Sequence, residues 1–332
     1  MKKHGVAAAV LSAALVLTSA AGASSRPVRI GIVLKALDNP FFITLYEGAR
    51  AEAGRRHAVA SFRATSVNDA AGQAAYARAL VRGGKEDCYV VNPLTGTNLI
   101  PAFRGAKRPV VNVDAPFDRA AARRAGLRIH SFIGTDDAAA GQLAAKEMVS
   151  ALGGRGEVAL LDGYRSSLNS TLRLRGFTRG VAGTQIRIVA TIVADYDRAK
   201  AQVAARRVLQ EHPNVTGFFA ANDVMALGIA EVLQIAGKRG TVKVIGVDAI
   251  PPALDAVRAG SLTATVAQYP YVMGRMGIEA CIAAVRGKAL PARVNAPIVL
   301  VNRQNVERVS TAFPLPPHGY NDPFARLLQG RR

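Results

Sequence analysis

Residues 28–34 read Val-Arg-Ile-Gly-Ile-Val-Leu, and residues 35–42 continue Lys-Ala-Leu-Asp-Asn-Pro-Phe-Phe. The first segment is a nearly continuous apolar run, which is typical of a strand buried on both faces of a parallel sheet. After it, apolar residues recur at helical spacing, and Asp38 or Asn39 can cap that helix. The stretch therefore predicts the carboxyl end of a first strand, which is the edge where open α/β sheets bind ligands.

Two adjacent aromatic residues, Phe41 and Phe42, follow this strand end directly. They can form an apolar wall beside the polar residues Lys35, Asp38 and Asn39. A flat apolar face with polar groups at its rim suits a small molecule that is rich in hydroxyl groups. The alternative is that both aromatic rings belong to the core.

Strand and helix patterns alternate through the rest of the chain, and the pattern begins again near residue 138. Such alternation predicts right-handed βαβ units and therefore α/β layers built on parallel sheets. Further strands are expected at 58–64, 88–91, 109–113, 128–133, 158–161, 186–192, 215–220, 242–247, 262–267 and 298–301. Helices are expected at 42–53, 69–81, 97–105, 138–152, 170–181, 198–211, 223–236, 254–257 and 272–285.

Polar residues recur where the predicted strands end. One such residue would mean little, because Asn and Asp favour turns and helix caps for backbone reasons alone. Several of them at the same edge favour a shared ligand site over independent capping. These residues are Asn92, Asp114, Asn222, Asp248 and Gln268.

Residues 1–23 have the pattern of a secretory signal peptide. Lys2 and Lys3 supply the positive start, an apolar segment follows, and Ala-Gly-Ala at 21–23 is a small-residue cleavage site. No later apolar run is as long as the roughly 20 residues that span a bilayer. We expect a mature periplasmic protein that begins near Ser24.

The chain is strongly basic, with 43 Lys and Arg against 23 Asp and Glu in 332 residues. Loss of the two leader lysines would leave 41 basic residues and a formal charge of +18. The basic residues are scattered along the sequence, which favours a solvated surface over a nucleic-acid site. At this length two domains of ordinary size are expected.

Cys88 and Cys281 are the two cysteines of the chain. An oxidising compartment would permit a disulfide, but the sequence does not decide whether the two residues meet. We interpret them as two small buried hydrophobic side chains.

Motifs for catalysis, metals and phosphate groups are missing from the sequence. No Gly-x-Gly-x-x-Gly, Walker or Gly-x-Ser-x-Gly motif is present, and the five histidines lack partners at metal-ligand spacing. No cofactor or metal is therefore predicted. Asp114 and Asp248 could form an acid/base pair in an exported carbohydrate enzyme, but we interpret both as acceptors for ligand hydroxyls.

Several short motifs occur in an order that resembles one family. The chain is similar to periplasmic sugar-binding proteins of the ribose-binding type, the soluble receptors of ABC importers, from about residue 28 to residue 301. In chain order the motifs are Asp38-Asn-Pro-Phe-Phe42, Val91-Asn-Pro93, Val113-Asp114, Arg173 ahead of Gly176-Phe177, Asp195-Tyr-Asp197, Ala221-Asn-Asp223, Gly246-Val-Asp248 and Thr265-Val-Ala-Gln268.

The resemblance implies an α/β, type I periplasmic binding protein fold: two similar doubly wound parallel-sheet lobes joined by three hinge strands, with the ligand between them. The expected first lobe is 24–134 plus 269–297, and the second is 135–268 plus 298–312. Residues 313–332 would form a Pro-rich tail without regular structure. The expected ligand-binding residues are Asn39, Phe41, Phe42, Asn92, Asp114, Arg173, Tyr196, Asn222, Asp248 and Gln268.

Two residues depart from the ribose pattern. Ala115 stands where that group has Arg after the pocket aspartate, and Tyr196 replaces a Phe. We expect Ala115 and Lys35 to determine specificity, so a pentose, a hexose, a cyclitol or a polyol are all candidates.

The resemblance implies a monomeric binding protein, not an enzyme, that delivers its ligand to a membrane permease. The alternative partner is a chemotaxis or sensor receptor. A sugar-responsive repressor of the same fold would need an N-terminal helix-turn-helix, and the leader occupies that place.

Overall fold

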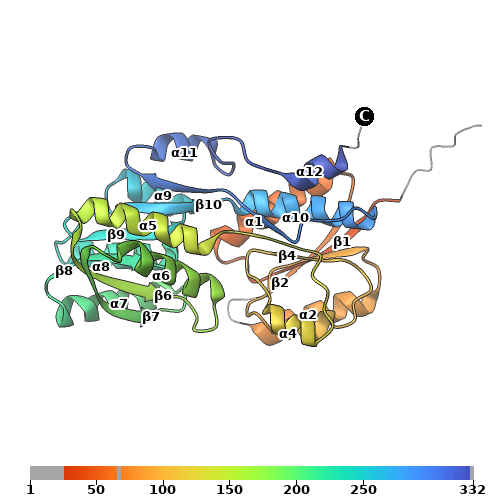
Figure 1. Cartoon of the computed structure of the whole chain (residues 1–332), viewed down its shortest axis with the longest axis horizontal. Coiled ribbons are helices and arrows are strands. Elements are labelled where there is room, and N and C mark those ends of the chain that lie inside the picture. Colours follow the sequence, from red (N-terminus) through yellow and green to blue (C-terminus); the bar gives the residue numbers. More distant parts are fainter. Residues whose placement is uncertain (1–25, 66–68, 330–332) are drawn as a thin grey trace, which may run out of the picture.

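The computed structural model describes residues 26–65 and 69–329. Two α/β lobes lie side by side along the long axis of the molecule (Figure 1). The leader predicted over residues 1–23 lies outside the described residues.

The first lobe is built on a six-stranded sheet in which neighbouring strands are parallel. The strand order is β11-β5-β4-β3-β1-β2, so the chain runs first to one edge and then to the other. The strands are β1 (Arg29–Leu34), β2 (Val59–Ala64), β3 (Cys88–Val91), β4 (Val110–Val113), β5 (Ser131–Gly134) and β11 (Arg293–Asn295). The helices are α1 (Pro40–Arg55), α2 (Ala70–Gly83), α3 (Ile100–Phe103), α4 (Arg119–Arg124) and α10 (Pro270–Val285).

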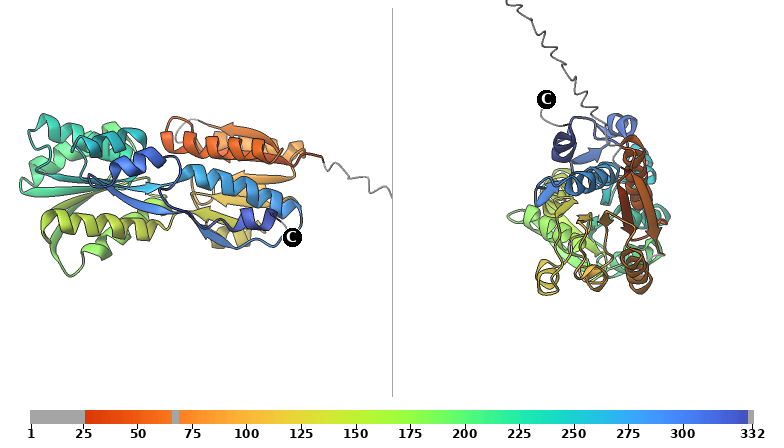
Figure 2. Two further views of the ribbon diagram at one scale, coloured as in Figure 1. Left: turned by 90° about the horizontal axis from the view of Figure 1, so that it is seen from above. Right: turned by 90° about the vertical axis from the view of Figure 1, so that its right-hand side faces the viewer.

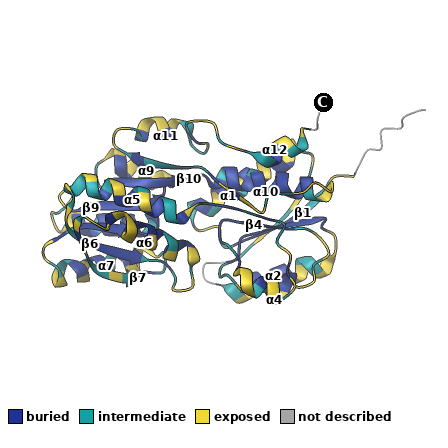
Figure 3. Cartoon of the chain, viewed as in Figure 1, coloured by how far each residue is buried: buried dark blue, intermediate teal, exposed yellow. Residues whose placement is uncertain are grey.

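The central strands β1, β3 and β4 of this lobe are buried on both faces, as the apolar run at 28–34 predicts for β1 (Figure 3). Successive strand residues point to opposite faces. Ile32 therefore joins the core under α1 and α10, whereas Val33 joins a separate core with Tyr89 and Phe103. Helices thus cover both faces of the sheet and leave its carboxyl edge open for a site.

The second lobe repeats this order in its own six-stranded sheet, β12-β10-β9-β8-β6-β7. All pairs are parallel except β12 with β10, which is antiparallel. The strands are β6 (Arg155–Asp162), β7 (Gln185–Val193), β8 (Val215–Ala220), β9 (Lys243–Asp248), β10 (Ala264–Gln268) and β12 (Ile298–Asn302). The helices are α5 (Asp137–Leu152), α6 (Leu168–Val181), α7 (Arg198–Glu211), α8 (Asp223–Ile235), α9 (Pro251–Arg258) and α11 (Val306–Ala312).

The two equivalent sheets confirm the predicted fold class, two similar doubly wound lobes. The chain passes between the sheets from β5 to α5, from β10 to α10 and from β11 to β12. We infer lobe boundaries at these three crossings. Because α10 and β11 return to the first sheet, each lobe is completed by a segment that is distant in sequence (Figure 2).

Close helix pairs occupy the same place in each lobe. A Cβ on Gly48 of α1 would stand 2.1 Å from the carbonyl oxygen of Tyr271 in α10. A Cβ on Gly141 of α5 would stand 2.0 Å from the carbonyl oxygen of Arg173 in α6. These glycines allow a backbone approach that any side chain would prevent.

The C-terminal segment is more regular than predicted. Beyond α11, the helix α12 (Pro323–Leu328) packs on α10, and Phe324 is fully buried. Asp322 caps α12 by accepting bonds from the amides of Phe324 and Ala325. The prediction of an irregular tail is wrong for this helix, because its stability comes from docking on α10 and not from its own short sequence.

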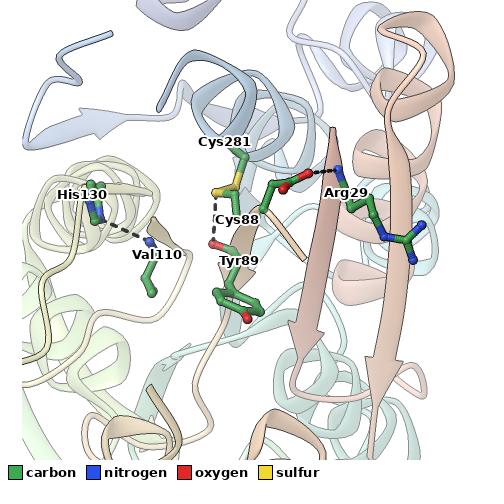
Figure 4. Close-up of a disulfide and its surroundings, with 7 residues drawn as sticks. Arg29, Cys88, Tyr89, Val110, His130 and Cys281 are labelled. Carbon is green, nitrogen blue, oxygen red and sulfur yellow. Dashed lines mark hydrogen bonds between the residues drawn. A yellow bond between two sulfur atoms is a disulfide. The ribbon is translucent and has the colours of Figure 1, made fainter. Parts of the chain in front are cut away.

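The interpretation of the cysteines as separate buried side chains is also wrong. Cys88 of β3 and Cys281 of α10 form a disulfide, with Cα atoms 5.6 Å apart (Figure 4). Both residues are fully buried, as expected. Their meeting depends on the return of α10 to the first lobe after strands β6 to β10 of the second lobe, which no local sequence pattern reports.

Replacement of both Cys88 and Cys281 by Ala should lower the free energy of unfolding by about 2–4 kcal/mol, because the unfolded chain regains the freedom of a long closed loop. The two cysteines are 193 residues apart. Urea unfolding without reductant measures the difference from the wild type. Equal unfolding midpoints for the two proteins would show that the bond adds no stability.

Candidate ligand-binding site

A cavity of about 350 Å³ lies between the lobes, at the carboxyl ends of the strands. Both lobes line it, the first through the segment after β1 and the turn after β4, the second through α6 and the ends of β8, β9 and β10. Among the residues predicted for the site, those that line this cavity are Lys35, Asn39, Phe41, Phe42, Asp114, Arg173, Tyr196, Asn222, Asp248 and Gln268.

Asn92 does not line the cavity, contrary to prediction. Its fully buried amide donates to Asp114 Oδ2 at 2.7 Å and to the carbonyl oxygen of Val113 at 3.2 Å. Asn92 therefore fixes the position of the Asp114 carboxylate from within the protein interior. The side chain follows a strand end, as expected, but it points along the sheet edge to its neighbour.

Asp114 presents its carboxylate from a turn with a positive φ of 57°. Asp is one of the few residues that tolerate this conformation. The ammonium group of Lys35 lies 3.4 Å from Oδ2, so Oδ2 faces two donors. Within the described part of the chain no hydrogen bond reaches Oδ1, which leaves that oxygen to accept one from a ligand.

Ala115 lines a different cavity from the one predicted. A second, outer cavity of about 260 Å³ is lined by Ala115 and by Lys35, Leu94 and Asn169, and the last three also line the main cavity. The outer cavity lies between residues 94–118 of the first lobe and 165–171 of the second. Ala115 thus lines this second cavity, called the outer cavity, and not the main one.

Arg173 is buried and held by several partners. Its Nε donates to Asp137 Oδ1 at 2.8 Å, and its Nη1 donates to the carbonyl oxygen of Ala221 at 2.7 Å and lies 3.5 Å from Asp248 Oδ1. Arg173 is 4% exposed. It is an anchored guanidinium whose remaining N–H groups can bind a ligand.

The charges around Arg173 depend on one another. Burial lowers the pKa of Arg173, but the carboxylates of Asp137 and Asp248 more than offset this effect and raise it. Burial raises the pKa of Asp137 to about 6 and that of Asp248 well above its usual range, and Arg173 opposes both shifts. Removal of the guanidinium would therefore leave two buried carboxyl groups that bind protons more readily.

Gln268 connects the site to the crossings between the lobes. Its Nε2 donates to Asp248 Oδ1 at 2.6 Å, and its Oε1 accepts a hydrogen bond from Thr135 Oγ1. Gln268 ends β10 at one crossing, and Thr135 follows β5 at another. A ligand contact at Asp248 thus bears directly on residues at two of the three crossings.

Asn39 and Asn222 are helix caps as well as cavity residues. Asn39 Oδ1 accepts from the amide of Phe41 at 2.9 Å, and Asn222 Oδ1 accepts from the amide of Met225 at 3.0 Å. Capping uses the side-chain oxygen and leaves the NH₂ group as a donor. Capping and ligand binding, considered above as alternatives, are compatible at both residues.

Aromatic rings of both lobes border the cavity. Phe41 and Phe42 meet edge to face with ring centres 5.2 Å apart, and Phe41 is also part of the core. On the other side, the Tyr196 hydroxyl lies 2.7 Å from Ser167 Oγ, and burial raises the pKa of Tyr196 to about 12. The phenol is therefore neutral, and the rings can cover the C–H faces of a sugar.

Sequence reasoning missed several residues at the site, and three of them take part in its contacts. Tyr164 lines the cavity and packs on Tyr196, Asp137 supports Arg173, and Asn169 donates across the cleft to the carbonyl oxygen of Asp114 at 3.2 Å. Asn169 and Asp137 each lie in the first turn of a helix, where polar residues are common. Their contacts with Asp114 and Arg173, which come from other parts of the fold, distinguish these two residues from ordinary polar residues at a helix start.

Two negative results concern the described residues alone. Residues 26–65 and 69–329 contain no group of three or more His, Cys, Asp or Glu side chains that could hold a metal ion. In the same residues no helix is both long and apolar enough to cross a membrane.

Comparison with known proteins identifies the family. The model of the periplasmic binding protein domain matches residues 30–289. The chain belongs to the periplasmic binding proteins. This finding confirms the resemblance seen in the sequence motifs.

Sugar-binding relatives are similar over most of the chain. The D-allose-binding periplasmic protein of Escherichia coli is 36% identical over 78% of this chain and 86% of its own length. The ribose import binding protein of Bacillus subtilis is 30% identical over 82% of this chain and 86% of its own length. These relatives are binding proteins and not enzymes.

A solved structure shows the same arrangement of lobes. It is an ABC transporter periplasmic solute-binding protein from Actinobacillus succinogenes with bound D-allose, with a TM-score of 0.80 and 28% identity. The similarity covers 84% of this chain and 99% of that chain.

Arg173→Ala should reduce the free energy of unfolding at pH 7 by about 3 kcal/mol, because Asp137 and Asp248 lose their buried cationic partner. In the variant, the folded-state pKa values of these carboxyls rise further above their unfolded values. Relative to the wild type, in which the pKa of Asp137 is already about 6, this penalty grows only as pH rises above about 6, so it is smaller at pH 5 than at pH 7.

Urea unfolding at both pH values measures the effect, and Arg175→Ala is the matched control. Arg175 is exposed on the same helix and forms no ion pair within the described residues. A loss of under 1 kcal/mol at pH 7, or a loss independent of pH, would contradict this account of Arg173.

Proposed function

We propose that this periplasmic binding protein captures a monosaccharide or a related polyhydroxy compound between its lobes and delivers it to an ABC transporter permease. One observation carries the proposal: carboxylate, amide and guanidinium groups from both lobes border one cavity together with aromatic rings. Such groups pair donors and acceptors with neighbouring hydroxyls, and the rings cover apolar C–H faces. Charge-assisted bonds in a dry site make an unmatched hydroxyl costly, which is the source of selectivity.

The proposed ligand class is an aldose. The relative with the highest identity reported above binds D-allose, and the solved structure contains D-allose, while the second relative imports ribose. We propose that Asp114, Arg173, Asn222 and Asp248 bind the hydroxyls. Lys35 lies beside Asp114 and over the ring of Phe42, 5.4 Å from its centre, where it can donate one further bond.

Lobe closure is the proposed mechanism. The ligand contacts both lobes only when they close, so its binding shifts the open–closed equilibrium, and the permease recognises the closed shape. We propose that the protein acts as a monomer and that residues 1–23 direct its export. The buried disulfide supports export, since such bonds persist in oxidising compartments.

A thermal-shift screen of the mature protein should find stabilisation by D-allose or D-ribose, because a ligand at 100 times its Kd adds about 2.7 kcal/mol to the free energy of unfolding.

Asp114→Ala should weaken binding of the best sugar roughly 10- to 100-fold, the effect of one charge-assisted hydrogen bond. Calorimetry measures both proteins.

Glu47→Ala is the control, because Glu47 is exposed on α1 and does not line the cavity. The proposal fails if no aldose, polyol or cyclitol stabilises the wild type. Asp114 is no ligand anchor if its variant binds within a factor of two of the wild type.

Ala115→Arg should shift selectivity from the hexose toward ribose, by about tenfold in the ratio of affinities. The guanidinium would enter the outer cavity, which shares Lys35, Leu94 and Asn169 with the main cavity, and from there take space that a larger sugar needs. Calorimetry with D-allose and D-ribose on both proteins gives the double difference.

Leu168→Arg adds the same charge to the outer cavity from the opposite lobe, at a residue that is 47% exposed. This control should leave the ratio unchanged. If Ala115→Arg changes both affinities by the same factor, position 115 does not determine the choice of sugar.

A further inference from the structure

The C-terminal segment makes a fourth connection between the lobes. After β12 in the second sheet, α11 packs on α9 of the second lobe, whereas α12 packs on α10 of the first lobe. Residues 313–322 join these two helices. In Figure 1 and Figure 2 the blue C-terminal chain leaves the second lobe at α11 and reaches the first lobe at α12.

The attachment to the second lobe is apolar and ionic. Val306 and Val309 of α11 are buried at 2% and 0% exposure. Glu307 accepts a hydrogen bond from Arg258 Nε of α9 at 2.7 Å. Asn305 also donates to the carbonyl oxygen of Leu300 in β12 at 2.8 Å, so α11 is held to the sheet as well as to α9.

The attachment to the first lobe is equally specific. Phe324 is fully buried in the core. Arg275 of α10 donates to the hydroxyl of Tyr320 at 3.0 Å and to Glu52 of α1 at 3.2 Å. The end of the tail is therefore bonded into the pair of helices that covers the first sheet.

The segment that connects α11 to α12 is short and rich in proline. Residues 313–322 read Phe-Pro-Leu-Pro-Pro-His-Gly-Tyr-Asn-Asp, with three prolines in ten residues. Proline fixes φ and limits the lengths that such a segment can adopt. Both attachments are formed in the arrangement in which Asn169 of the second lobe bonds to Asp114 of the first.

We propose that residues 303–329 form a strap that restricts rotation of the lobes and holds the ligand-free protein nearer to its closed arrangement. Rotation of the lobes requires residues 313–322 to change their span or α12 to leave α10. The apparent affinity is proportional to the fraction of protein that is competent to bind. A looser strap therefore lowers the closed fraction and weakens sugar binding, although no strap residue lines the cavity.

An insertion in the connecting segment distinguishes restriction of lobe rotation from stabilisation of the first lobe by α12 packed on α10. Eight Gly and Ser residues between His318 and Gly319, which are both exposed, keep the two attachments but remove the length limit. The matched control is the same insertion between Ala182 and Gly183, which are exposed in the loop between α6 and β7 of the second lobe alone.

Fluorescent labels on Arg78→Cys in α2 and Arg206→Cys in α7 report the distance between the lobes in the full-length protein. Both positions are exposed, and the native cysteines are occupied by their disulfide. The strap insertion should broaden and lengthen the distance distribution without ligand. It should also weaken binding of the sugar found in the screen about fivefold or more, with a melting temperature equal to that of the control insertion.

The proposal is overturned if the strap insertion matches the control insertion in the distance distribution without ligand. A truncated protein ending at Ala312 that melts lower would then show only that α12 stabilises the first lobe. The distance measurement uses no sugar, so a failure of the proposed sugar-binding function would leave this test of the strap intact.

Discussion

A chain of buried polar contacts joins the cavity to the crossings between the lobes. Arg173 is held by Asp137 at the start of α5 and lies beside Asp248. Asp248 accepts from Gln268, which in turn accepts from Thr135 at another crossing. Because each buried charge or amide requires its partner, a ligand that binds at Arg173 or Asp248 acts on residues at the crossings between the lobes.

The topology makes that coupling possible. Each lobe begins with one continuous segment and is completed by a later one, so the chain crosses between the lobes three times. The disulfide between β3 and α10 links the two segments of the first lobe covalently, and α12 adds a third segment to the same lobe. The first lobe is thus assembled from parts that are distant in sequence but rigid once joined.

Most residues of the site were predictable because parallel sheets bring the carboxyl ends of their strands to one edge. Asp114, Asn222, Asp248 and Gln268 needed only this rule and the strand pattern. Asn92 obeys the same rule but donates to Asp114, since neighbouring side chains at a strand end can bond to each other as readily as to a ligand. Ala115 follows Asp114 in the chain and faces the outer cavity, because the turn directs the two residues to different sides.

The sequence by itself determined the α/β layers, the repeated lobe and the polar edge, because apolar periodicity and turn chemistry are local properties. The tertiary structure alone decided the Cys88–Cys281 bond, the pairing of Arg173 with Asp137 and the docking of α12. Each of these contacts joins elements that local patterns do not relate to each other. Their formation depends on the way the chain returns to a sheet it has left, and this return is a property of the whole fold.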